Sequence, residues 1–157
     1  MYKERLKAVL VFIDGTICDR SAQVHLLETP EFYEREAILE GFPVPGSAAC
    51  LQELAGEYNI VYIGARPGSA LEYTREWLQR MGFPEGRVHL GKAQEERLEI
   101  VRGLRGEFDF AAGIGDRWDD NELHLELGCL SIILKEHEGN WDTVRRHLLG
   151  KRKDKKP

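Results

Sequence analysis

Residues 7–16, KAVLVFIDGT, decide the fold of this chain. The run from Lys7 to Ile13 is almost continuously apolar, which is typical of a β-strand buried on both faces. Asp14, Gly15 and Thr16 then place an acidic side chain, a turn residue and a hydroxyl group where the strand ends. The stretch therefore predicts a buried strand that delivers polar groups to one edge of a sheet.

Strands and helices alternate along the rest of the chain, without internal repeats or low-complexity linkers. Short apolar runs predict further strands at 60–63, 87–90, 108–114 and 129–134. Apolar residues at helical spacing, with start and stop signals, predict helices at 31–39, 47–58, 69–81, 93–104, 121–127 and 141–149. Two helix starts have specific signals: Thr29 as N-cap before Pro30, and a capping box of Ser69 and Glu72.

This order of elements predicts a three-layer, Rossmann-like α/β fold. A parallel sheet of about five strands would have helices on both faces, because parallel strands need crossover connections. In such sheets, ligands bind beyond the carboxyl ends of the strands. We therefore expect a functional site among the residues that follow each strand.

Carboxylates, glycine turns and cationic residues follow four of the predicted strands. They are Asp14, Gly15 and Thr16; Gly64 and Arg66; Lys92; and Asp116, Arg117, Asp119 and Asp120. Carboxylate oxygens suit a hard cation such as Mg²⁺. The backbone N–H groups of Gly15 and Thr16, the Thr16 hydroxyl and Lys92 suit a phosphate oxygen beside that metal. Each motif alone is typical of a turn or a solvated loop, but their joint placement predicts phosphoryl recognition.

The same segments resemble the motifs of the haloacid dehalogenase (HAD) superfamily of phosphohydrolases, and the resemblance runs over most of the chain. The similar stretches are VLVFIDGTI at 9–17, IVYIGARP at 60–67, Lys92, and GIGDRWDD at 113–120. The resemblance implies Asp14 as general acid and base and Lys92 as the lysine that neutralises charge. It further implies Mg²⁺ ligands Asp116 and Asp120, or Asp119 in place of Asp120, and we expect Asp14 to be a ligand as well. The expected phosphate site consists of Gly15, Thr16, the N–H group of Gly64, and Arg66.

Two positions depart from the HAD pattern. Members of the superfamily have a nucleophilic aspartate where this chain has Phe12, and a phosphate-binding Thr or Ser where it has Gly64. A phenyl ring has no lone pair for phosphorus or for a metal, so covalent catalysis and one Mg²⁺ contact would be lost. Deleting the nucleophile of a hydrolase costs about a millionfold in turnover, or ~8 kcal/mol of transition-state stabilisation.

The cationic residues near the expected site have two interpretations that stay open at this point. Arg66 and Arg117 could clamp a substrate phosphate, or they could neutralise the neighbouring aspartates within the chain. The five histidines lack metal-ligand spacing, and we interpret them as surface or structural residues. We expect His89 to lie nearest the site because it precedes Lys92.

We expect residues 1–150 to form one HAD-like domain and residues 151–157 to form a basic, disordered tail. By the resemblance, residues 18–46 occupy the place of a cap over the site, here a minimal one with a single helix. The tail has five basic residues and one acidic residue, so its net charge of +4 leaves −9 for residues 1–150. An acidic body argues against nucleic acid as a partner.

Three widely spaced cysteines, Cys18, Cys50 and Cys129, indicate reduced thiols in the cytoplasm rather than a disulfide framework or a zinc site. No run approaches about 18 uninterrupted apolar residues, so we expect no membrane span. The first residues also lack the cleavage pattern of a signal peptide.

These features predict a HAD-like protein that binds Mg²⁺ at a weakened site and a phosphorylated small molecule or a protein partner. Because Phe12 replaces the nucleophile, we expect phosphatase activity to be absent or strongly impaired, as in a pseudoenzyme. The alternative is an active Mg²⁺-dependent phosphomonoesterase that uses another nucleophile or water activated by Asp14.

Overall fold

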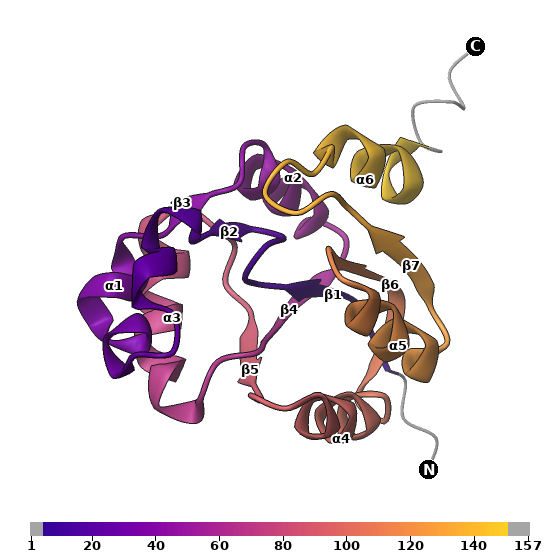
Figure 1. Ribbon diagram of the computed structural model, residues 1–157. Helices are drawn as coiled ribbons and strands as arrows, with labels where there is room; N and C mark the ends of the chain where they lie inside the picture. Colours follow the sequence, from indigo (N-terminus) through magenta and orange to yellow (C-terminus); the bar gives the residue numbers. More distant parts are fainter. Residues whose placement is uncertain (1–4, 151–157) are drawn as a thin grey trace.

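The structure is a computed structural model that describes residues 5–150. Five parallel strands form its central sheet (Figure 1). They are β1 (Leu6–Phe12), β4 (Asn59–Gly64), β5 (Arg87–Leu90), β6 (Phe108–Gly115) and β7 (Leu130–Ile133), in the order β5-β4-β1-β6-β7. The predicted α/β fold with a five-stranded parallel sheet is confirmed.

Helices cover both faces of this sheet. They are α2 (Ser47–Leu54), α3 (Leu71–Arg80), α4 (Gln94–Leu104), α5 (Trp118–Leu127) and α6 (Trp141–Leu148). Successive side chains of β1 alternate between two apolar cores, as the period of a strand requires. Val9 and Val11 pack with side chains of α2, α3 and α6, whereas Leu10 and Phe12 pack with side chains of α4 and α5.

Residues 18–46 leave the sheet after β1 and return before α2. The two-residue strands β2 (Cys18–Asp19) and β3 (Phe42–Pro43) pair antiparallel at the base of this segment. Between them lie two 3₁₀ turns, η1 (Ser21–Leu26) and η2 (Pro30–Tyr33), and the short helix α1 (Arg35–Leu39). Figure 1 shows these indigo and purple elements beside α3, to which the segment is tied by a hydrogen bond from the Trp77 indole to the Gly41 carbonyl (2.9 Å).

Two predicted helix starts differ from the structure. Thr29 precedes η2, but its hydroxyl donates to the Leu26 carbonyl (2.6 Å) instead of accepting from the following turn. Ser69 lies in a 3₁₀ turn, η3 (Gly68–Ala70), and Ala70 is the N-cap of α3, so no capping box with Glu72 forms. In both places a local turn uses the backbone groups that the predicted caps would have bound.

Helix α5 also begins earlier than predicted, at Trp118 rather than at residue 121. Asp120 causes the earlier start, because its Oδ2 accepts hydrogen bonds from the backbone N–H groups of Asp116 and Arg117 (3.0 Å each). Acceptors of this kind satisfy the free donors at a helix N-terminus. Asp119 and Asp120 are therefore helical residues rather than members of a loop.

The three cysteines are free thiols, two of them buried, which agrees with the prediction from their spacing. Across residues 5–150 we find no helix with the length and apolarity that a membrane crossing requires. The predicted basic tail at 151–157 lies outside the described residues.

Candidate functional site

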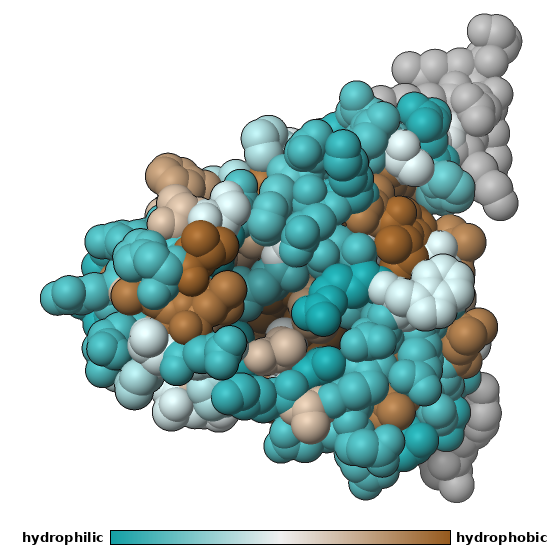
Figure 2. All heavy atoms as spheres, viewed as in Figure 1, coloured by the Kyte–Doolittle hydropathy of each residue, from teal (hydrophilic) through white to brown (hydrophobic). Residues whose placement is uncertain are grey.

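A cleft of about 360 Å³ opens at the carboxyl edge of the sheet, between the 18–46 segment and the loops that follow β1, β4 and β6. Its walls include Phe12, Asp14, Arg20, Tyr33 and Arg117. Figure 2 shows this face hollowed, with hydrophobic side chains of the 18–46 segment beside the hollow. A larger hollow of about 700 Å³ lies at the amino ends of β4 and β5 and contains none of the predicted site residues. The smaller cleft is therefore the candidate functional site.

Phe12 is the last residue of β1 and forms part of the cleft floor. Only 2% of its surface is exposed, because the ring packs into the core shared with α4 and α5. The guanidinium of Arg97 lies 6.0 Å from the ring centroid and donates to the Gly91 carbonyl (2.7 Å). The end of β1 thus carries a packed aromatic ring.

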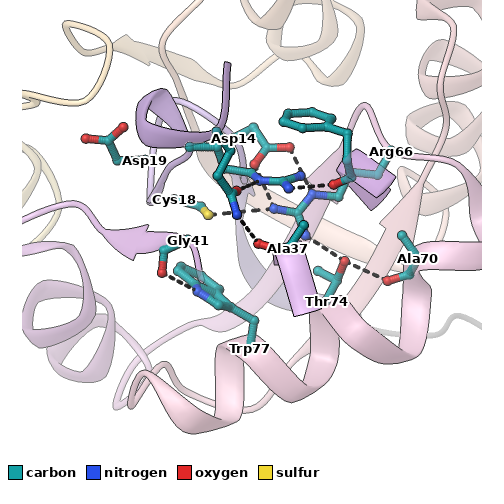
Figure 3. A network of polar contacts seen from close by, with 12 residues as sticks. Asp14, Cys18, Asp19, Ala37, Gly41, Arg66, Ala70, Thr74 and Trp77 are labelled. Carbon is teal, nitrogen blue, oxygen red and sulfur yellow. Dashed lines mark hydrogen bonds and ion pairs between the residues drawn. The ribbon is translucent and has the colours of Figure 1, made fainter. Parts of the chain in front are cut away.

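Asp14 is bound on both carboxylate oxygens by Arg66 (Figure 3). The Arg66 Nε lies 2.9 Å from Oδ2 and Nη2 lies 2.7 Å from Oδ1, while Nη1 donates to the Thr74 hydroxyl (2.8 Å). Burial alone would raise the pKa of Asp14, but the charge and hydrogen bonds of Arg66 outweigh burial and hold that pKa below its usual value.

Of the two interpretations of Arg66, the structure therefore supports neutralisation of Asp14 within the chain. The Arg66 side chain is fully buried, and its donors point to Asp14, Thr74 and Cys18. The expectation that Arg66 binds a ligand phosphate does not fit this arrangement.

The loop after β1 uses its own donors internally. The Gly15 N–H donates to the Cys18 carbonyl (2.8 Å), and the Thr16 N–H donates to the Ile13 carbonyl (3.2 Å). The Thr16 hydroxyl donates to Oδ1 of Asp116 (2.7 Å). The phosphate-binding donors predicted at Gly15 and Thr16 are thus engaged with the chain itself.

Gly15 is required in this loop for two reasons. Its φ of +95° is a conformation that side chains disfavour, and an added Cβ would lie 2.3 Å from Oδ2 of Asp116. The glycine therefore allows the Asp116 carboxylate to approach the backbone closely.

Asp116 and Asp120 follow β6, as predicted, but face different partners. Oδ2 of Asp116 is buried and has no hydrogen-bond partner, and burial raises the pKa of Asp116 to about 6. Burial also raises the pKa of Asp120, whose Oδ2 caps its own helix.

The arrangement of these aspartates does not fit the predicted magnesium site. Within residues 5–150, no group of three or more His, Cys, Asp or Glu side chains is arranged to hold a metal ion. Arg66 occupies both Asp14 oxygens, and Asp120 is turned to the start of α5. Since Phe12 offers no oxygen, the donor set does not fit a resident Mg²⁺ coordinated by Asp14, Asp116 and Asp120.

The two remaining predicted residues lie at the ends of β4 and β5. Lys92 is exposed, and its ammonium lies 5.9 Å from the centroid of the Tyr33 ring, which lines the cleft. A side chain at Gly64 would meet apolar groups, because an added Cβ would lie 3.1 Å from Ile13 and 3.3 Å from Leu90. Lys92 therefore belongs to the surroundings of the cleft, whereas Gly64 is part of the core beneath it.

The cleft is also lined by residues that the sequence did not predict: Arg20, Tyr33, Glu136 and His137. Arg20 is only 6% exposed, and its guanidinium lies 3.7 Å from the Phe32 ring centroid. The position of Arg20 in the sequence, four residues after Thr16, could have indicated that it lies near the cleft. His137 comes from the loop after β7, where its N–H donates to the Gly15 carbonyl (2.9 Å), and nothing in the local sequence marks that contact.

The amino-acid sequence has little similarity to known protein families and to curated proteins. No protein-family model matches this chain. One curated protein, from Bacillus cereus (strain ATCC 14579) and described as a "Putative nucleotidase", is 35% identical over 71 residues. The aligned part covers 43% of this chain, and it spans 38% of the relative, well under two thirds of that protein's length.

Solved structures share the whole fold. A class C acid phosphatase from Bacillus anthracis matches with a TM-score of 0.65 and 21% identity, over 99% of this chain and 81% of that one. A HAD-like hydrolase from Streptococcus pneumoniae matches with a TM-score of 0.64 and 14% identity, over 90% of each chain. A HAD enzyme variant from Bacteroides thetaiotaomicron, in complex with magnesium and inorganic phosphate, gives a TM-score of 0.55 and 14% identity over 88% of this chain and 98% of that one.

These likenesses show that the chain has the α/β fold of HAD-family hydrolases.

Proposed function

We propose that this protein binds a phosphorylated or otherwise anionic ligand in the cleft and does not hydrolyse phosphomonoesters at a useful rate. The Asp14–Arg66 ion pair carries this proposal. A general acid must hold a proton at the working pH, and Arg66 keeps the pKa of Asp14 below its usual value. With Phe12 in place of a nucleophile, neither chemical step of the family mechanism has the group it needs.

The same ion pair argues against the alternative of an active phosphomonoesterase. A carboxylate that activates water needs a free oxygen directed at that water and enough basicity to take its proton. Both oxygens of Asp14 are held by a fully buried guanidinium, which lowers their basicity. Water activation by Asp14 would therefore have to rely on a carboxylate whose pKa lies below its usual value.

We expect this protein to bind Mg²⁺ only weakly. The magnesium complex among the structural neighbours makes use of this ion plausible for the fold. Among the side chains of residues 5–150, Asp116 alone has a buried oxygen without a hydrogen-bond partner, and one carboxylate is a poor site for an ion that prefers several oxygens. We expect anion binding in the cleft to be independent of Mg²⁺.

The cleft suits a small molecule better than a large one. Its volume of about 360 Å³ lies within the range of small-ligand pockets. Residues of the 18–46 segment form one wall of the cleft, which supports a role for this segment as a minimal cap. The free cysteines are consistent with a reducing compartment such as the cytoplasm.

Turnover of a generic phosphomonoester, p-nitrophenyl phosphate, in the presence of Mg²⁺ tests the catalytic half of the proposal. We expect no turnover above that of an Asp14→Ala control. Phe12→Asp restores a carboxylate at the nucleophile position, and Phe12→Ala is its matched control because it disturbs the same core without adding one. Brisk turnover by the unmodified protein, abolished in Asp14→Ala, would refute the proposal in favour of the active phosphomonoesterase.

A further inference from the structure

Arg20 is a buried cation with an unused donor. Its Nε donates to the Gln23 side chain (2.6 Å) and its Nη2 to the Phe32 carbonyl, whereas the buried Nη1 has no hydrogen-bond partner. The side chain is 94% buried and forms part of the cleft wall. A buried guanidinium nitrogen without a partner is costly, so this position favours an acceptor from outside the chain.

Arg20 also lacks a counter-ion of its own. Asp14 attracts Arg20, but both Asp14 oxygens are bound to Arg66. In the part of the chain that the structure describes, Arg20 forms no salt bridge. Arg20 and Arg66 thus share the Asp14 carboxylate. The charges of Arg117 and Glu136 on the same cleft offset each other, so one positive charge remains for an anion to neutralise.

The wall around Arg20 is apolar. Val24 and Leu27, from η1 and the residue after it, line the cleft with 61% and 53% of their surfaces exposed. The buried rings of Phe12 and Phe32 lie in the same cleft. A hydrated inorganic ion gains nothing from such surfaces, whereas the apolar part of an organic anion would cover them.

We propose that Arg20 is the anion-binding residue of the cleft and that the ligand is a small organic anion, with its phosphate or carboxylate held by the Arg20 guanidinium and an apolar group against Val24 and Leu27. This subsite lies on the 18–46 segment rather than on the loops of the sheet edge. There, the donors of Gly15, Thr16 and Arg66 are already used within the chain. The inference rests on the proposed function and specifies which residue binds and what ligand it takes.

Isothermal titration calorimetry with phenyl phosphate, phenylacetate and inorganic phosphate tests this subsite. We expect at least one aromatic anion to bind about tenfold more tightly than inorganic phosphate. The two aromatic probes separate a phosphate head group from a carboxylate head group. Equal affinity for inorganic phosphate and both aromatic anions would overturn the apolar half of the proposal.

Variants locate the binding. Arg20→Lys keeps the charge but loses the planar fork of donors. We expect this substitution to lower the affinity for the preferred aromatic probe about tenfold. Leu27→Ser changes an exposed side chain and so leaves folding intact. Leu27→Ser should lower the affinity for the aromatic probes and leave the affinity for inorganic phosphate unchanged. Thermal melts show whether each variant is folded. If Arg20→Lys does not fold, the probe affinities of Leu27→Ser test the subsite.

Arg117→Gln tests the competing position for the anion, since Arg117 is an exposed cation on the same cleft. We expect this substitution to weaken binding less than Arg20→Lys does. If a folded Arg20→Lys binds like the unmodified protein while Arg117→Gln loses binding, the Arg20 subsite is refuted and anion binding in the cleft stands. If the unmodified protein binds none of the probes at millimolar concentration, the subsite and the binding half of the proposed function both fail.

Discussion

At residue 14, one carboxylate faces a guanidinium that is fully buried, and the two groups are 52 positions apart in the chain. The pair forms because β1 and β4 are neighbours and their carboxyl ends meet at the same edge. Removing either partner leaves the charge of the other one inside the protein without compensation. The free-energy cost of such a charge is larger than the stabilisation that an exposed ion pair contributes.

Arg66→Met should therefore lower the free energy of unfolding by about 3 kcal/mol. Urea denaturation monitored by circular dichroism measures this change. Arg35→Met is the matched control, because Arg35 forms a similar two-point ion pair with Glu76 on the exposed surface of the molecule. The control should unfold close to the unmodified midpoint, and an equal loss in both variants would contradict the special role of burial.

At the scale of an element, the loop between β1 and β2 works as one unit. Gly15 permits the turn, Thr16 binds Asp116, and Asp116 fills the space that a side chain at position 15 would need. The loop and the start of α5 are therefore packed against each other through backbone and carboxylate atoms.

Gly15→Ala should destabilise the fold by about 2 kcal/mol, because its Cβ meets a carboxylate at a positive φ. Gly103→Ala is the matched control in α4, where no atom lies within 4 Å of the added Cβ. That substitution should raise stability by roughly 1 kcal/mol, since alanine is the better helix former. Opposite signs in the two thermal melts support the argument, and a neutral Gly15→Ala contradicts it.

At the scale of the whole molecule, two buried groups give opposite pH dependences. His124 is 2% exposed and bonded to the Ser131 hydroxyl, and burial lowers its pKa to about 4. Between pH 6.5 and 4 the unfolded chain thus binds a proton that the folded chain does not, so acidification removes stability. Asp116, with its pKa raised by burial to about 6, is protonated first in the folded state and adds stability as the pH falls from 6 toward 4.

The two variants that remove these groups should change the acid dependence in opposite directions. From pH 7 to pH 4.5, the unmodified protein should lose less stability than Asp116→Asn and more than His124→Gln. Below pH 4, the lowered pKa of His124 reduces the free energy of unfolding by its full amount, about 3 kcal/mol. Urea midpoints at several pH values check this order, and parallel curves for all three proteins would refute it.

Much of the fold was predictable because strand and helix patterns repeat over short distances. Apolar runs such as 7–13 identified the five strands, and their alternation with helices implied the parallel sheet that the structure has. The helix boundaries were less predictable, since the start of α5 depends on Asp120 binding two backbone N–H groups.

For the site, the sequence by itself determined which groups reach the sheet edge, including the absence of a carboxylate at Phe12. Only the tertiary structure decided what those groups do there. It pairs Asp14 with Arg66 and directs the donors of the loop after β1 to acceptors within the chain. Among residues 5–150, it leaves Nη1 of Arg20 without a hydrogen-bond partner. The reason is physical: periodicity places a residue on an element, but its charge state and partners depend on which distant elements pack against it.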